Sequence, residues 1–275
     1  MIWRSLLSRP LIVAGLLILL LMALASLFAG SLAPFDPGKM ALMQRIQAPG
    51  IAHYFGTDEF GRDVYSRLLF AGRLSLSVGV LVAIVSIFLG TVLGVCAGYF
   101  RKLDTPLSRL IDALMAFPDI LLAIALMAAF GPSLSNVVIA LGVVYTPRVA
   151  RVVRAVTMVQ RELPFVEASR SMGAGPLWII RVHILPNLLP PLLVQGTFIF
   201  AYAILAESAL SFLGVGVPPQ NPTWGNMIAT GQSYFQRADW MMLFPGAAIA
   251  LTVLSLQLVG DALRDALDPK LRRSV

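Results

Sequence analysis

Six long apolar runs dominate the 275-residue chain and restrict it to a membrane-spanning fold. Hydrophobic residues make up 58% of the chain and charged residues 13%, against about 25% charged in a typical soluble domain. Each run is close to the length of about 20 residues that a helix needs to cross a bilayer. Because backbone polar groups must be paired within hydrocarbon, runs of this length predict helices rather than barrel strands. The predicted spans are residues 11–33, 74–98, 110–130, 134–150, 188–214 and 241–263.

These runs predict an all-α membrane protein, a polytopic bundle of six transmembrane helices. One domain covers residues 11–275 and follows a short tail, residues 1–10. The first run is longer than the apolar core of a signal peptide, about 7–15 residues, so we expect it to be retained. Lys and Arg accumulate on the cytoplasmic side of membrane proteins, and with the tail inside, 15 of the 21 basic residues fall on that side. We therefore expect an inner (plasma) membrane protein with both termini in the cytoplasm.

The net charge of +7 fits this topology and does not indicate a nucleic-acid partner, since the basic residues are scattered beside span ends. Cys96 is the one cysteine, which excludes a disulfide framework. The two histidines, His53 and His183, fall on opposite sides of the membrane in this topology. We therefore expect no metal site.

Two loops are expected outside the membrane. In residues 34–72, Thr57 or Asp58 is a plausible N-cap, and Phe60, Val64 and Leu68 follow at a spacing of four, which predicts an amphipathic helix at the outer membrane face. The second loop covers residues 215–240. Its Trp224 and Trp240 are suited to the interfacial aromatic belt.

A polar stretch between the fourth and fifth spans interrupts the apolar pattern, within an expected cytoplasmic loop of residues 151–187. The pattern predicts a helix over 163–172, a break at 173–175, and a second helix that starts at Pro176. Leu185 and Pro186 are expected to end that helix before the fifth span. The product is a helical hairpin that either docks a soluble partner or is only a solvated loop.

The residues of this hairpin resemble the EAA motif of the membrane subunits of ABC importers. The resemblance rests on Glu167-Ala168-Ser169, then Gly173, then Leu185-Pro186. Within that group the chain is similar to the second, C-type subunit of the dipeptide, oligopeptide and nickel permease family. Four further segments resemble signatures of that family, in the same order. They are residues 55–68 (FGTDEFGRDVYSRL), 206–216 (AESALSFLGVG), 222–227 (PTWGNM) and 260–269 (GDALRDALDP).

The resemblance implies a permease with an ABC type I importer fold that forms half of a translocation pathway. The implied partners are a paralogous permease subunit in a heterodimer, two cytoplasmic ATPase subunits and an extracytoplasmic solute-binding protein. It also implies that the hairpin couples to the ATPase through Glu167, Ala168, Ser169, Arg170, Gly173, Arg181, Leu185 and Pro186. Gly173 supplies the turn, because a positive φ is least costly for glycine. Two departures from the wider motif stand out, Ser169 in place of its second alanine and His183 in place of isoleucine.

No catalytic chemistry is visible in the chain. It lacks the Gly-x-x-x-x-Gly-Lys-Ser/Thr phosphate loop, so ATP and Mg are expected to bind to the partner ATPase and the chain itself needs no cofactor. Neither histidine has a nucleophile and an orienting carboxylate placed with it. The chain is therefore expected not to be an enzyme.

Charged residues within spans are candidates for function, because an ionisable group at bilayer depth is costly. Asp119 and Glu207 are the candidates for the pathway or a subunit interface, or else they only brace helices. Asp112 is expected to pair with Arg109, three residues earlier. A solvated helix end, held by pairs three or four residues apart, is expected for Asp261, Arg264, Asp265 and Asp268.

Peptides are the cargo that the resemblance implies first, with nickel, glutathione or another small solute as alternatives. A secondary transporter is the alternative of another class, since it could also have six spans and buried carboxylates. Such a transporter would not need a hairpin. A channel subunit would need a pore helix or filter, and the sequence shows neither.

Overall fold

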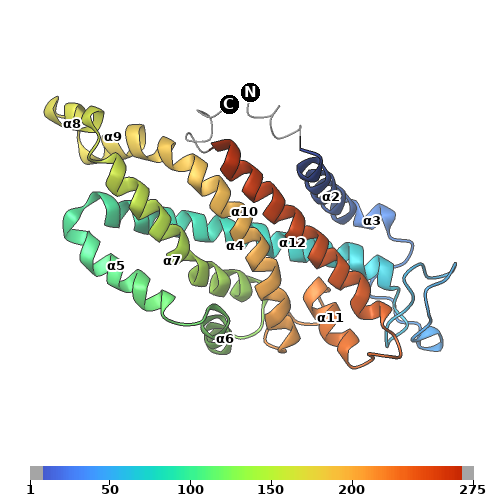
Figure 1. Cartoon of the computed structure of the whole chain (residues 1–275). Coiled ribbons are helices and arrows are strands. Elements are labelled where there is room, and N and C mark those ends of the chain that lie inside the picture. Colours follow the sequence, from blue (N-terminus) through green and yellow to red (C-terminus); the bar gives the residue numbers. More distant parts are fainter. Residues whose placement is uncertain (1–8, 268–275) are drawn as a thin grey trace.

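The computed structural model describes residues 9–267, and among these residues it contains helices and no strand, which confirms the predicted all-α fold. The predictions for the tail before Arg9 and for Asp268 and Pro269 concern residues outside this range. The elements are α2 (Pro10–Leu27), α3 (Ala29–Leu32), η1 (Leu42–Gln44), α4 (Val64–Tyr99), α5 (Arg101–Met115), α6 (Asp119–Phe130), α7 (Leu134–Gln160), α8 (Pro164–Ser171), α9 (Pro176–Ile179), η2 (Ile180–Ile184), α10 (Leu185–Phe212), α11 (Trp224–Gln232) and α12 (Trp240–Leu267) (Figure 1).

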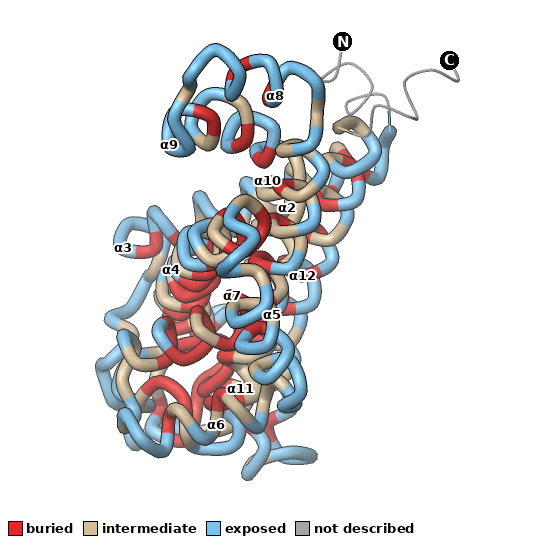
Figure 2. The backbone as a smooth tube through the Cα atoms, turned by 90° about the vertical axis from the view of Figure 1, so that its left-hand side faces the viewer, coloured by how far each residue is buried: buried red, intermediate tan, exposed pale blue. Residues whose placement is uncertain are grey.

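Within the described residues, five helical stretches are long and apolar enough to cross a membrane. They are α2, α4, α7, α12, and a continuous stretch from α9 through α10. The bent pair α5 and α6 makes a sixth if it is counted as one span, in agreement with the six predicted runs. Buried residues gather in the middle of the bundle (Figure 2). Helix α2 lies at its edge with little of its surface covered (Figure 1).

Three glycines bring the backbone of α4 directly against α7. Because they are four residues apart, they lie on one face of the helix. A Cβ atom built on each would lie 2.5–2.7 Å from the Cβ atom of its α7 neighbour. The pairs are Gly90 with Val149, Gly94 with Val153, and Gly98 with Thr157. Residue numbers rise together along this seam, so α4 and α7 run parallel. Small residues at this spacing let two membrane helices pack closely.

The parallel packing of α4 and α7 requires the chain between them to cross the bundle. We predicted one helix over residues 110–130, and this prediction was wrong in shape. The crossing is made by α5 and α6, which are bent by 92° relative to each other. Pro118 explains the break, because proline has no N–H to donate and disfavours a helical conformation at the residue before it.

The first loop also differs from its prediction. No separate amphipathic helix forms, because α4 starts at Val64 and continues for 36 residues into the span. The N-cap is Asp63, whose carboxylate accepts the N–H of Ser66 at 2.7 Å, and not Thr57 or Asp58. Asp58 instead accepts N–H groups of its own loop, from Phe60 and Arg62.

The loop expected over residues 215–240 contains a helix, α11. Its N-cap Thr223 and Asn226 form a capping box, in which Asn takes the place of the usual Glu or Gln. Trp224 is only 1% exposed and donates to the carbonyl of Leu68, so its predicted place in an interfacial belt is wrong. The indole of Trp240 donates to the carbonyl of Thr57 and ties this region to the first loop.

Both described ends of the chain lie at the same end of the bundle. Arg9, before α2, pairs with Asp265, in the last turns of α12, at 2.9 Å. Asp265 therefore has a partner outside α12, at the N-cap of α2, which the expected pairing within α12 did not include. The hairpin of α8 and α9 lies at this end as well, and the loop of residues 36–63 lies at the other (Figure 1). We call these the hairpin end and the loop end.

The glycine seam yields a stability prediction. Gly94→Val should lower the thermal stability of the detergent-purified protein by several degrees, because overpacking a tight contact costs about 1–3 kcal/mol. Gly246→Val is the matched control, since no atom lies within 4 Å of a Cβ built on that α12 glycine. Fluorescence-detected size exclusion after heating measures both variants. Equal melting of the two would contradict the role of the seam.

Candidate functional site

The hairpin at the end of the bundle is built around a glycine turn. Gly173 has φ of +90°, which confirms the predicted positive φ, and nothing lies within 4 Å of a Cβ built on it. Glycine is therefore required by the backbone conformation and not by lack of space. The N–H of Gly173 donates to the carbonyl of Arg170, and that of Ala174 to the carbonyl of Ser169, both at 3.0 Å. These two bonds form a Schellman motif, which ends α8 and fixes the turn.

The second arm of the hairpin continues into the membrane without a stop. Pro176 is the first residue of α9, as predicted, but the expected end at Leu185 and Pro186 is wrong. The chain passes from α9 through the π-helical segment η2 into α10. Proline is accommodated there because Pro186 lies in the first turn of α10, after the wider π turn. A single helical rod therefore joins the hairpin to the fifth span.

The two arms are tied together by the two residues that depart from the wider motif. Ser169 of α8 and His183 of η2 lie within hydrogen-bonding distance, with Oγ and Nε2 3.0 Å apart. The His183 ring also contacts the rings of Phe165 and Trp178, with centroids 5.2 Å away in each case. We call this cluster of four residues the hairpin strut. Both departures are visible in the sequence, but the contact between Ser169 and His183 is not.

The predicted coupling residues share one environment. All of them are exposed at the hairpin end except Ser169, which is buried in the strut. Apolar side chains are exposed beside them, with Met172 at 82% and Leu177 at 80%. The exposed set is Glu167, Ala168, Arg170, Gly173, Arg181, Leu185 and Pro186. This surface projects away from the bundle on a fixed turn, as a docking surface requires (Figure 1).

Glu207, the first candidate within a span, lies inside the subunit. Its side chain has no exposed surface and accepts the hydroxyl groups of Ser211 and Thr223, each at 2.8 Å. Thr223 is the N-cap of α11, so this carboxylate fastens α10 to α11. The structure therefore assigns Glu207 a contact between these two helices, inside the subunit.

Asp119, the second candidate, is part of a row of ion pairs between α7 and the α5–α6 segment. It starts α6 and pairs with Arg148 of α7. Asp112 pairs with Arg151 at 2.7 Å, so its expected pairing with Arg109 is wrong. Asp104 pairs with Arg154 at 2.6 Å. We call these three pairs the ion-pair row.

The row was missed because the fourth span was predicted to end at residue 150, with the arginines beyond it in a loop. In the structure α7 continues to Gln160. Arginines at 148, 151 and 154 then recur every three residues on one face. This spacing of the arginines is visible in the sequence. The carboxylates that face them are brought there only by the parallel packing of α4 and α7.

Just beyond α7, the Arg161 guanidinium hydrogen-bonds to Glu162 and lowers the pKa of that carboxyl.

A second charged cluster lies at the loop end. Arg62 bonds Asp58 at 2.6 Å and Glu59 at 3.1 Å, and Arg67 lies 3.6 Å from Asp58. Burial raises the pKa of Glu59, and one of its carboxylate oxygens has no partner among the described residues. His53 meets Asp63 at 2.9 Å in the same loop. These contacts give residues 36–63 a fixed shape, although η1 is the one helix within them.

Comparison with known proteins identifies the architecture. Residues 86–273 match the family of binding-protein-dependent transport system inner membrane components, and residues 1–49 match the N-terminal transmembrane domain of oligopeptide transport permease C. The chain is also similar in fold to the MetNI methionine ABC transporter in inward-facing conformations. That match has a TM-score of 0.59 at 21% identity and covers 74% of this chain and 97% of the other.

Two curated relatives align over nearly the whole chain. A putative peptide transport system permease protein of Brucella suis is 50% identical, over 98% of this chain and 91% of the relative. The dipeptide transport system permease protein DppC of Alkalihalophilus pseudofirmus is 42% identical, over 98% of this chain and 89% of the relative. The chain therefore belongs to the binding-protein-dependent inner membrane transport components, the multi-pass permease subunits of ABC importers.

Proposed function

We propose that this permease forms half of the pathway through which an ATP-driven importer moves peptides delivered by an extracytoplasmic solute-binding protein. The observation that carries the proposal is the exposed hairpin, which has a rigid turn and a continuous helical connection to α10. Peptides are proposed as the cargo because the two relatives are named for peptide and dipeptide transport. A paralogous permease subunit would form the other half of the pathway.

The hairpin is proposed to dock on a cytoplasmic ATPase that binds ATP and Mg, with none bound by this chain. Glu167 and the arginines Arg170 and Arg181 provide charge at its surface, and Met172 and Leu177 provide exposed apolar contact. Such a surface, apolar in part and edged by charge, fits a protein partner better than a bilayer. The hairpin end would then be cytoplasmic, which also places both termini there.

ATP dependence tests the function. In vesicles that hold this permease with its partner permease, its ATPases and its binding protein, uptake of a labelled tripeptide should stop on ATP depletion while the proton gradient is held. The ATPase chains should also copurify with the permease. Uptake that follows the gradient alone would identify a secondary transporter instead.

The turn is tested by Gly173→Val. A branched side chain at positive φ costs about 1–3 kcal/mol, so the turn should distort and peptide uptake should fall roughly fivefold to a hundredfold while insertion is unchanged. Gly175→Val is the matched control, because Gly175 has φ of −72° and also has open space around a Cβ. ATP-driven uptake and the amount of inserted protein are measured for both. Wild-type uptake by Gly173→Val would refute the requirement for the turn.

The hairpin strut is tested by a double-mutant cycle. Ser169→Ala and His183→Phe, which keeps a ring beside Phe165 and Trp178, should each lower peptide transported per ATP hydrolysed by about twofold to tenfold, as expected for one hydrogen bond of about 0.5–1.5 kcal/mol. The double variant should be little worse than either single variant, because both remove the same bond. Ser171→Ala, at an exposed position of α8, serves as the control and should behave as wild type. Fully additive losses would show that the two residues act separately.

A further inference from the structure

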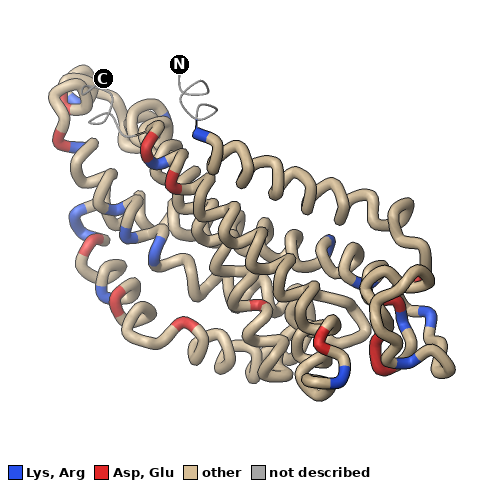
Figure 3. Tube along the Cα trace, turned by 45° about the vertical axis from the view of Figure 1, so that its right-hand side comes forward, with Lys and Arg blue, Asp and Glu red and all other residues tan. Residues whose placement is uncertain are grey.

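The ion-pair row lies on a face of the subunit that lipid cannot cover. The side chains of Arg148 and Asp119 are 38% and 39% exposed, and those of Arg151 and Asp112 are more exposed still. Charged groups are unfavourable against hydrocarbon at bilayer depth. The middle of α2 and of α12 carries no charge, so these helices form the face suited to lipid (Figure 3).

The same face carries a break in the backbone. Between α5 and α6 the helix is interrupted at residues 116–118, and Phe117 is 59% exposed there. An irregular backbone at membrane depth is tolerated where it is buried in protein or lines a water-filled cavity. A protein interface is the poorer fit here, because interface centres are depleted of charge and each ion would lose hydration. The ion-pair row and the break together indicate water.

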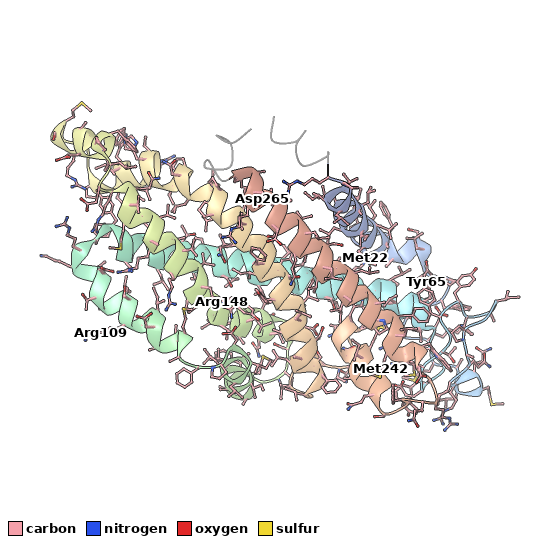
Figure 4. The ribbon with its side chains drawn as sticks, in the orientation of Figure 1. Met22, Tyr65, Arg109, Arg148, Met242 and Asp265 are labelled. Atoms are coloured by element: carbon pink, nitrogen blue, oxygen red, sulfur yellow. The ribbon has the colours of Figure 1, made fainter. Side chains whose placement is uncertain are left out.

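Arg148 is the deepest charge of the row. It lies 12 residues before the end of α7, which is about 18 Å along the helix. Arg148 is labelled on α7 in Figure 4. Its guanidinium lies 5.5 Å from the ring centroid of Tyr145 and 5.3 Å from that of Tyr202, so two rings orient it. Tyr202 belongs to α10 and is partly exposed on the same surface.

On these grounds we propose that the ion-pair row lines a water-filled part of the pathway and that Arg148 is a site that binds the C-terminal carboxylate of the passing peptide. This inference rests on the proposed function. A guanidinium has five N–H donors in a planar fork, and Asp119 occupies only part of it. Every linear peptide with a free C-terminus presents a carboxylate, so this contact is independent of side chains. Competition with Asp119 keeps the contact weak enough for release.

Water access is tested with single cysteines in a Cys96→Ala background. Phe117→Cys and Tyr202→Cys represent the proposed pathway, and Leu251→Cys and Leu254→Cys represent exposed positions of α12. In the assembled transporter, a charged methanethiosulfonate reagent should modify the first two, in at least one nucleotide state, and not the second two. If all four are equally unreactive in a complex that hydrolyses ATP, the face is sealed by protein and the inference fails.

Carboxylate binding is tested by Arg148→Gln. Uptake of a tripeptide with a free carboxylate should fall roughly tenfold to a hundredfold relative to wild type, as expected for loss of a charge-assisted hydrogen bond, while ATP hydrolysis persists. Uptake of the same peptide as its C-terminal amide, also expressed relative to wild type, should fall much less. Arg148→Lys should recover part of the activity.

The control is Arg9→Gln, which removes an exposed ion pair between α2 and α12 and should leave both peptides unaffected. Equal losses for acid and amide in Arg148→Gln would overturn carboxylate binding and leave only a structural role. Wild-type complexes that take up neither peptide would instead refute the proposed function, so the two failures are distinguishable.

Discussion

The close packing of α4 on α7 determines where the functional residues of this permease lie. Without a Cβ at Gly90, Gly94 and Gly98, the two helices approach until side chains of α7 rest on the backbone of α4. Because this packing is parallel, the intervening chain must cross the bundle as α5 and α6. That crossing sets the carboxylates of α5 and α6 opposite the arginines of α7. A seam made only of small residues therefore positions a row of charges.

Much of the fold was predictable because each element has a local cause. Hydrophobic length gave the six spans, and the glycine at 173 gave the hairpin turn, which depends only on the backbone conformation of that residue. The failures occurred where a distant contact decided the outcome. Trp224 looked interfacial, yet it is buried because α11 folds back against α4. Asp112 looked like a partner for Arg109, and it pairs with Arg151 because α7 is longer than its apolar run.

The candidate site likewise contains residues that the local sequence predicts and residues whose contacts depend on distant parts of the chain. Most hairpin residues could be assigned from a contiguous motif, whereas the contact of Ser169 with His183 joins positions 14 residues apart across a turn. Glu207 was singled out for its charge, and only the position of Thr223 shows that it fastens α10 to α11. A sequence pattern thus locates a residue on its own helix. The neighbouring helix determines whether that residue binds, braces or faces water.

The hairpin is connected by continuous chain to the helices that form the proposed carboxylate site at Arg148. One arm follows directly from α7, which carries Arg148, and the other continues without interruption into α10, which carries Tyr202. The seam holds α7 against α4, while Glu207 fastens α10 to α11 near the opposite end. A displacement of the hairpin would therefore act on two helices whose side chains meet at Arg148. We infer that docking at the hairpin alters the spacing of these rings around the guanidinium, and with it the hold on a carboxylate.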